Sequence, residues 1–109
     1  MNVWYRVGDL EAARDFYVDT LGFRELFRGG EGRWMRLGRE GVEFALAEGR
    51  PSEEEEAVLT FDVGDLRAEA ERLRLAGVEV GVVVEIPGTI RLLDVYDPDG
   101  NRIQLTEDL

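Results

Sequence analysis

The side chains of this chain that could do chemistry are carboxylates, arginines and two tryptophans. The sequence has no histidine and no cysteine, and all 13 of its basic residues are arginine. Transition metals usually need imidazole or thiolate donors, and Schiff-base chemistry needs a lysine amine. The chemistry that remains is cation binding or proton transfer by carboxylates, and stacking by Trp4 and Trp34.

The net charge of the chain is strongly negative and unevenly distributed. It is −11 overall, and residues 51–109 carry 5 arginines against 15 acids, or −10. Such a surface repels phosphate backbones, which excludes nucleic acid as a partner and favours a basic ligand. We also expect no membrane segment and a cytoplasmic protein, because there is no signal-peptide pattern and no apolar run near the roughly 20 residues of a spanning helix.

A four-residue motif occurs twice and divides the chain into two halves. Val7-Gly8-Asp9-Leu10 recurs at residues 63–66. An alternating or apolar run precedes each copy, and each aspartate is a good helix N-cap. Apolar residues at helical spacing follow, and the pattern ends at Gly22 in the first half and at Gly77 in the second.

Each half then continues with three strands separated by turns that contain glycine. The expected strands cover residues 23–28, 33–37 and 42–47, then 78–85, 89–96 and 101–106. The sequence therefore predicts an α+β fold of two paired βαβββ modules, forming a cupped mixed sheet with helices on its outer face. Because one module alone would expose an apolar sheet face, the modules are expected to pair within the chain or by swapping between chains, with a homodimer either way.

The predicted organisation is a single domain over residues 1–109. A first module covers 1–47, an acidic linker covers 48–56, and a second module covers 57–109. We interpret Phe16, Tyr17, Phe44 and Phe61 as core residues.

This organisation resembles the vicinal-oxygen-chelate superfamily, the glyoxalase, bleomycin-resistance and extradiol-dioxygenase group. Residues 7–23, VGDLEAARDFYVDTLGF, are similar to its first-module signature, and residues 97–105, DPDGNRIQL, are similar to its final hairpin. The group includes metal-dependent lyases and dioxygenases and also metal-free bleomycin-binding proteins. The resemblance therefore implies a fold and a small-molecule site in the cup, but no single reaction.

The resemblance also implies where metal ligands would lie. The corresponding positions are occupied by Asn2, Ala45, Val58 and Gln104. None is the histidine or glutamate expected there, and this set cannot hold a catalytic Zn²⁺ or Fe²⁺. We therefore predict no metal and no cofactor.

Strand alternation extends these positions into a predicted lining of the cup. The residues expected to bind a ligand are Asn2, Trp4, Arg6, Glu43, Ala45, Val58, Thr60, Asp62 and Gln104. Trp4 is expected to stack on a flat or cationic ligand, or else to pack in an interface or the core. Arg6 and Asp62 occupy equivalent repeat positions and are expected to pair across the cup.

Three functions remain open from the sequence. The first is a metal-free binder of a basic or aromatic small molecule, similar to the bleomycin-resistance branch, which would hold its ligand in the cup between modules or subunits. The second is a divalent-metal-dependent lyase or dioxygenase with relocated carboxylate ligands. Its candidate ligands are Glu43, Asp62, Asp94 and Glu107. The third is a structural or interaction module whose cup is filled by its own side chains.

Overall fold

The computed structural model describes residues 3–50 and 57–109, and the chain divides into two compact units. Unit 1 is Met1–Ala57 with Pro98–Asn101, and unit 2 is Val58–Asp97 with Arg102–Leu109. Asn2 and most of the predicted linker lie outside the described residues.

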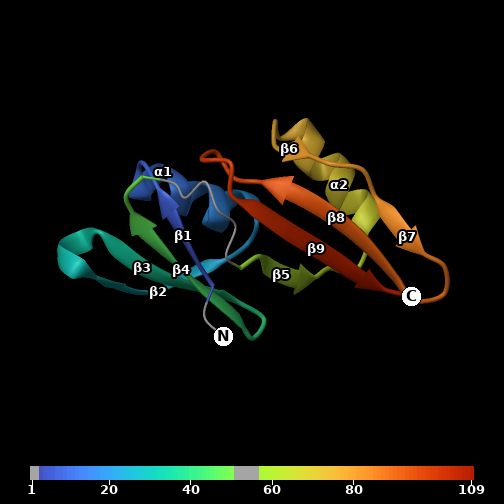
Figure 1. The fold of residues 1–109 in the computed structure, drawn as a ribbon, viewed down its shortest axis with the longest axis horizontal. Helices are drawn as coiled ribbons and strands as arrows, with labels where there is room; N and C mark the ends of the chain where they lie inside the picture. Colours follow the sequence, from blue (N-terminus) through green and yellow to red (C-terminus); the bar gives the residue numbers. More distant parts are fainter. Residues whose placement is uncertain (1–2, 51–56) are drawn as a thin grey trace. The chain divides into compact units, whose positions relative to one another are not determined.

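Unit 1 is a four-stranded sheet with a helix on one face (Figure 1). Its elements are β1 (Trp4–Val7), α1 (Leu10–Asp15), a π-helical turn (Phe16–Thr20), β2 (Arg24–Gly29), a 3-10 turn (Gly30–Gly32), β3 (Trp34–Arg39) and β4 (Val42–Glu48). The strand order is β1-β4-β3-β2, with β1 parallel to β4 and the other neighbours antiparallel.

Unit 2 repeats this plan with one strand divided. Its elements are β5 (Leu59–Asp62), α2 (Leu66–Leu75), β6 (Glu79–Val80), β7 (Val84–Ile86), β8 (Ile90–Tyr96) and β9 (Arg102–Asp108). The strand order is β5-β9-β8-β6, and β7 also pairs with β8. The predicted α+β class and the βαβββ order of each half are therefore confirmed.

The strand predicted over 78–85 is two short strands. Val80 pairs with Val95 and Val84 pairs with Leu92, so the register shifts by one residue between them. Gly81 lies at this shift, and its amide still donates to the carbonyl of Asp94 at 2.8 Å. A one-residue bulge of this kind ends regular pairing, which strand-length patterns in the sequence do not reveal.

The repeated aspartates cap both helices as predicted. Asp9 Oδ1 accepts from the amide of Ala12 at 3.1 Å, and Asp65 Oδ1 accepts from the amide of Ala68 at 3.0 Å. Each bond satisfies an amide of the first turn that has no partner within the helix. The matching geometry explains why the same motif begins both helices.

The first helix departs from regular α geometry at Phe16. Phe16 and Tyr17 are both predicted to be core residues, and the π-helical turn separates them by adding a residue to the turn. Tyr17 is fully buried, whereas Phe16 is half-buried. Phe44 and Phe61 are buried as predicted.

The core of unit 1 lies between α1 and one face of its sheet. Tyr5 and Val7 point into it from β1, and the rings of Tyr17, Phe23 and Phe44 meet there. Trp4 and Arg6, which alternate with these residues, point to the other face and are exposed. We call this side of the unit 1 sheet, which no described helix of unit 1 covers, the open face.

Candidate ligand-binding site

A pocket of about 270 Å³ opens on the open face of unit 1. It is lined by Val3, Trp4, Trp34, Arg36, Glu43, Phe44 and Ala45. Both tryptophans of the chain are therefore in its lining. Pockets that hold drug-sized ligands have volumes of roughly 300–1,000 Å³, so this one suits a small ring system or one part of a larger ligand.

The strand register places a small floor between two large walls. Ala45 of β4 lies opposite Trp4 of β1 on one side and opposite Arg36 of β3 on the other. Neighbouring strands are about 4.8 Å apart, so Trp4 and Arg36 rise from strands about 10 Å apart. A methyl group between an indole and a guanidinium leaves a slot that a flat ring can enter.

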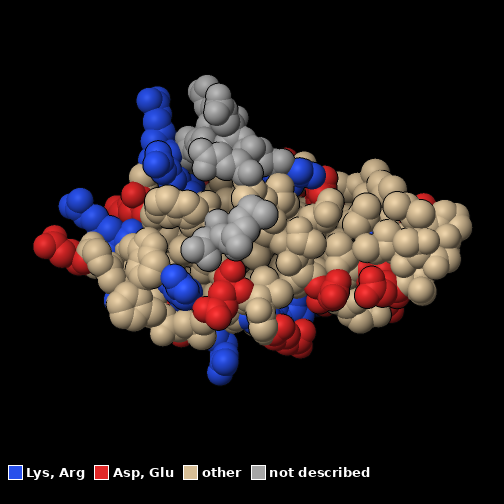
Figure 2. All heavy atoms as spheres, turned by 60° about the horizontal axis from the view of Figure 1, so that its bottom comes forward, with Lys and Arg blue, Asp and Glu red and all other residues tan. Residues whose placement is uncertain are grey.

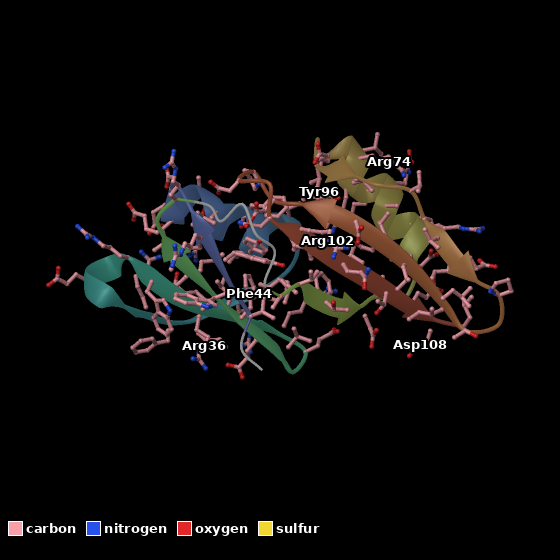
Figure 3. The ribbon with its side chains drawn as sticks, viewed as in Figure 1. Arg36, Phe44, Arg74, Tyr96, Arg102 and Asp108 are labelled. Atoms are coloured by element: carbon pink, nitrogen blue, oxygen red, sulfur yellow. The ribbon has the colours of Figure 1, made fainter. Side chains whose placement is uncertain are left out.

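Trp34 extends the second wall and holds Arg36 in place. The guanidinium carbon of Arg36 lies 5.7 Å from the centre of the Trp34 ring, within the range of a cation–π contact. Phe27 of β2 packs edge-to-face on Trp34 with ring centres 5.5 Å apart. Figure 3 shows Arg36 extending from the sheet on the side opposite α1.

Glycines on the neighbouring strands make room for this aromatic cluster. A Cβ atom added at Gly29 would lie 2.9 Å from the Phe27 ring and 3.4 Å from Trp34. A Cβ atom at Gly38 would lie 2.7 Å from Leu26. Contacts under 3.0 Å are steric clashes, so the glycines allow Phe27 and Leu26 to lie close against the sheet.

Ion pairs on the opposite face hold β2 against α1. Glu25 of β2 accepts from Arg14 at 2.7 Å and from Arg28 at 3.0 Å, and Arg28 also pairs with Glu11. The hydrogen bond from Arg28, followed by that from Arg14, lowers the pKa of the Glu25 carboxyl. The edge strand that carries Phe27 is therefore anchored on its other side.

The charged groups of the open face are mostly basic. Arg36 and Glu43 form an ion pair with 3.9 Å between Nη1 and Oε1, which is too long for a hydrogen bond. Arg6 lies on the same face, as does Arg24, which pairs with Gly38 in the register. Among the described strand residues, three arginines therefore share this face with one glutamate, although the whole chain carries −11.

The predicted site residues of unit 2 form a separate polar group. Thr60 lies opposite Gln104, and Asp62 lies opposite Thr106 and accepts its hydroxyl hydrogen bond. Gln104 donates to Asp94 at 3.4 Å. Arg102, which Figure 3 labels, pairs with Asp94 at 3.3 Å. These side chains satisfy one another within the unit 2 sheet.

The sequence of this chain matches one family model over nearly its whole length. The model is that of the Glyoxalase/Bleomycin resistance protein/Dioxygenase superfamily, and it matches residues 2–105. The chain belongs to this superfamily. A search of curated protein sequences finds no match.

Several solved structures share the fold. TnmS3, an antibiotic binding protein from Streptomyces sp. CB03234, is 30% identical, with a TM-score of 0.73 and coverage of 100% of this chain and 96% of the other. The integron cassette protein HFX_CASS4 from the Halifax Harbour Sewage Outfall metagenome is 24% identical, with a TM-score of 0.82 and coverage of 98% and 96%.

A third structure shows the fold at lower identity. The fosfomycin resistance protein FosX from Mesorhizobium loti is 19% identical, with a TM-score of 0.76 and coverage of 100% of this chain and 91% of the other. Together with the family model, these likenesses establish a glyoxalase-superfamily fold over both modules.

The metal positions implied by the glyoxalase superfamily do not fit a metal among the described residues. Ala45 and Val58 have no donor atom, and the amide of Gln104 is engaged with Asp94. Within residues 3–50 and 57–109, no three histidine, cysteine, aspartate or glutamate side chains come together in a group that could hold a metal.

Three of the four relocated carboxylate candidates belong to unit 2, and they do not share one face of its sheet. Asp62 and Asp94 lie opposite Thr106 and Gln104 of β9. Glu107, on the other side of β9, caps α2 through the amide of Leu66 and pairs with Arg91. Alternation along β9 therefore separates Glu107 from the remaining carboxylates.

The pocket brings together some of the predicted site residues and adds others. Trp4, Glu43 and Ala45 line it, and Arg6 lies on the same face outside its lining. Arg6 and the predicted partner Asp62 belong to different units, so their pairing stays a prediction. Sequence reasoning missed Arg36 as a pocket wall, although its position two residues after Trp34 on a strand was a usable signal.

Proposed function

We propose that this chain is a small-molecule-binding protein that holds a flat aromatic ligand in the pocket of unit 1 without a metal. The observation that carries the proposal is the slot between Trp4 and Arg36, with Ala45 as its floor. An aromatic wall, a cationic wall and a small apolar floor are a composition that binds flat rings. The antibiotic binding of TnmS3, which is 30% identical, supports the proposal.

The exposure of the walls favours a binder over a pocket filled by its own side chains. Trp4 is 53% exposed, and a residue that plugged its own cavity would be buried. Large aromatic side chains left in water are costly unless a partner covers them. Trp4 is thus available to a ligand.

Replacement of the tryptophan walls tests this function. We expect Trp4→Ala and Trp34→Ala each to weaken the binding of a naphthalene probe about two- to tenfold, because an aromatic contact contributes roughly 0.5–1.5 kcal/mol. Isothermal titration calorimetry with 2-naphthoate, 2-naphthalenemethanol and 2-naphthylmethylammonium measures the loss. The matched control is Leu75→Ala, an 81% exposed apolar residue of α2 outside the pocket.

Two outcomes of these titrations would contradict the proposal. If none of the three probes binds at millimolar concentration, the pocket is not an aromatic site. If a probe binds but both tryptophan variants bind it unchanged, the ligand site is elsewhere.

A further inference from the structure

We infer that the ligand of this pocket carries an anionic group, such as a carboxylate, which Arg36 binds. The inference rests on the proposed function and names the class of its ligand: a planar aromatic acid. It differs from the expectation of a basic ligand, which followed from the charge of the whole chain. The charges near the pocket, rather than the net charge, decide which ligand enters it.

The guanidinium of Arg36 contacts Trp34, but its N–H donors have no hydrogen-bond acceptor among the described residues. Its central carbon lies 5.7 Å from the centre of the Trp34 ring, and its one ion pair with a described residue, Glu43, spans 3.9 Å. Among the described residues, Arg36 makes no hydrogen bond at its donor atoms, whereas Arg14, Arg28 and Arg91 form ion pairs of 3.3 Å or less. A planar guanidinium with free edges is suited to bind a carboxylate through two parallel hydrogen bonds.

The contact with Trp34 makes Arg36 a better anion receptor. Stacking on the indole restricts the side chain before the ligand arrives, so less conformational freedom is lost on binding. Arg36 lines the same pocket as Trp4, so its N–H donors lie within reach of a ligand in the slot. A ring stacked on Trp4 would then present a carboxylate substituent to those donors across Ala45.

The surroundings of the pocket disfavour a cationic ligand. A cation over Trp34 would compete with Arg36 for the same ring, and the two positive charges would repel. Arg6 and Arg24 add positive charge to the open face, and Glu43 is the one acidic side chain that the described strands place there. Figure 2 shows both basic and acidic side chains on the left of the view, so the charges of the open face are identified from the residues that the strand register places there.

Glu43 limits how strongly the pocket prefers an anionic ligand. It lies beside Arg36 with its side chain 55% exposed, and it competes with a ligand carboxylate for the same guanidinium. An incoming anion must displace this weak ion pair. Removal of the Glu43 charge therefore makes the pocket a stronger receptor for anions.

Three naphthalene probes that differ only in charge test the inference. We expect 2-naphthoate to bind at least tenfold more tightly than 2-naphthalenemethanol, and 2-naphthylmethylammonium to bind most weakly, by isothermal titration calorimetry. Arg36→Gln should reduce the preference for naphthoate to twofold or less, and Glu43→Gln should tighten naphthoate binding two- to threefold. Arg33→Gln is the matched control, because it removes the same charge from an exposed arginine outside the pocket lining.

A second substitution separates charge from geometry. Arg36→Lys keeps the positive charge but loses the planar stack and the paired donors, so naphthoate binding should fall between the parent and Arg36→Gln. Thermal unfolding of each variant shows whether it is folded before the titration. Arg36 has a half-exposed side chain, so its replacement is compatible with folding.

The outcomes distinguish this inference from the proposed function. Equal affinity for the three probes, or tighter binding of the ammonium, overturns the inference and leaves an aromatic binder. A naphthoate preference that survives Arg36→Gln also overturns it, because the anion site is then another group. Failure of all three probes overturns the proposed function and the inference together.

Discussion

At the scale of single residues, the pocket depends on which side chains are absent as much as on which are present. Ala45 provides a floor that does not fill the slot, and Gly29 leaves space for Phe27 to pack on Trp34. Larger side chains at either position would change the pocket without touching the protein core. These two residues are therefore sensitive positions for binding rather than for stability.

Gly29→Ala tests this view. The added methyl would lie 2.9 Å from the ring of Phe27, so that ring and its contact with Trp34 must shift. The backbone of Gly29 is extended, with φ −143°, so alanine adopts it without strain. In protein labelled with 5-fluorotryptophan, the ¹⁹F resonance of Trp34 should move while that of Trp4 stays in place.

The control for this substitution is Gly38→Ala. There the clash is with the end of the flexible and half-exposed Leu26 side chain, which can rotate away. Neither tryptophan resonance should move by a comparable amount. An unchanged Trp34 signal in Gly29→Ala would show that Phe27 does not position the indole.

At the scale of elements, the motif that occurs at residues 7–10 and 63–66 begins one helix in each unit. Asp65 caps α2, and the same helix end receives Glu107 from β9 through the amide of Leu66. We expect Asp65→Ala to lower the free energy of unfolding by about 1 kcal/mol, because an N-cap bond is lost. Urea denaturation followed by circular dichroism measures the difference.

The conservative variant separates capping from charge. Asp65→Asn keeps an acceptor at the cap and should retain most of the stability, since asparagine is an equally good N-cap. Asp9→Ala offers the same test at α1. If Asp65→Asn is as unstable as Asp65→Ala, the role of the aspartate is its charge near the helix terminus and not its hydrogen bond.

The ion pairs between α1 and β2 link helix and edge strand in unit 1. Glu25 accepts from arginines of both elements, and its pKa is lowered, first by Arg28 and then by Arg14. A carboxyl whose pKa is lowered on folding contributes stability above its unfolded pKa and loses that contribution as the pH falls through the folded value. The attachment of the β2 edge is therefore strongest at neutral pH.

At the scale of the whole molecule, exposed apolar surface points to association. Trp4 and Phe27 on unit 1, and Val84 and Ile86 on unit 2, are each about half exposed. Contiguous apolar patches on soluble proteins commonly mark interaction sites. Among the described residues no helix has the length and apolar character needed to cross a membrane.

We predict a homodimer on these grounds. Light scattering coupled to gel filtration should give about twice the chain mass of 12.3 kDa. The charge of −11 works against association, so the dimer fraction should increase with salt as the repulsion is screened. A mass of one chain at every salt and protein concentration would contradict the prediction.

The cytoplasmic location expected from the sequence stays a prediction.

The features that the sequence predicted are those that depend on residues close together in the chain. The caps at Asp9 and Asp65 were predicted because an N-cap depends on residues within one turn. The exposed side of β1 was predicted because strand alternation is a property of consecutive residues. The divided strand at Gly81 and the π-helical turn at Phe16 were not, because both depend on contacts with other elements.

The sequence by itself determined the fold class, the two βαβββ modules and the absence of histidine, cysteine and lysine chemistry. Only the tertiary structure decided that Arg36 faces Trp4 across Ala45, and that Phe27 supports Trp34. The physical reason is that the pocket depends on the register between strands. A shift of one residue between β3 and β4 would turn different side chains toward Trp4, and residue types alone do not specify that register.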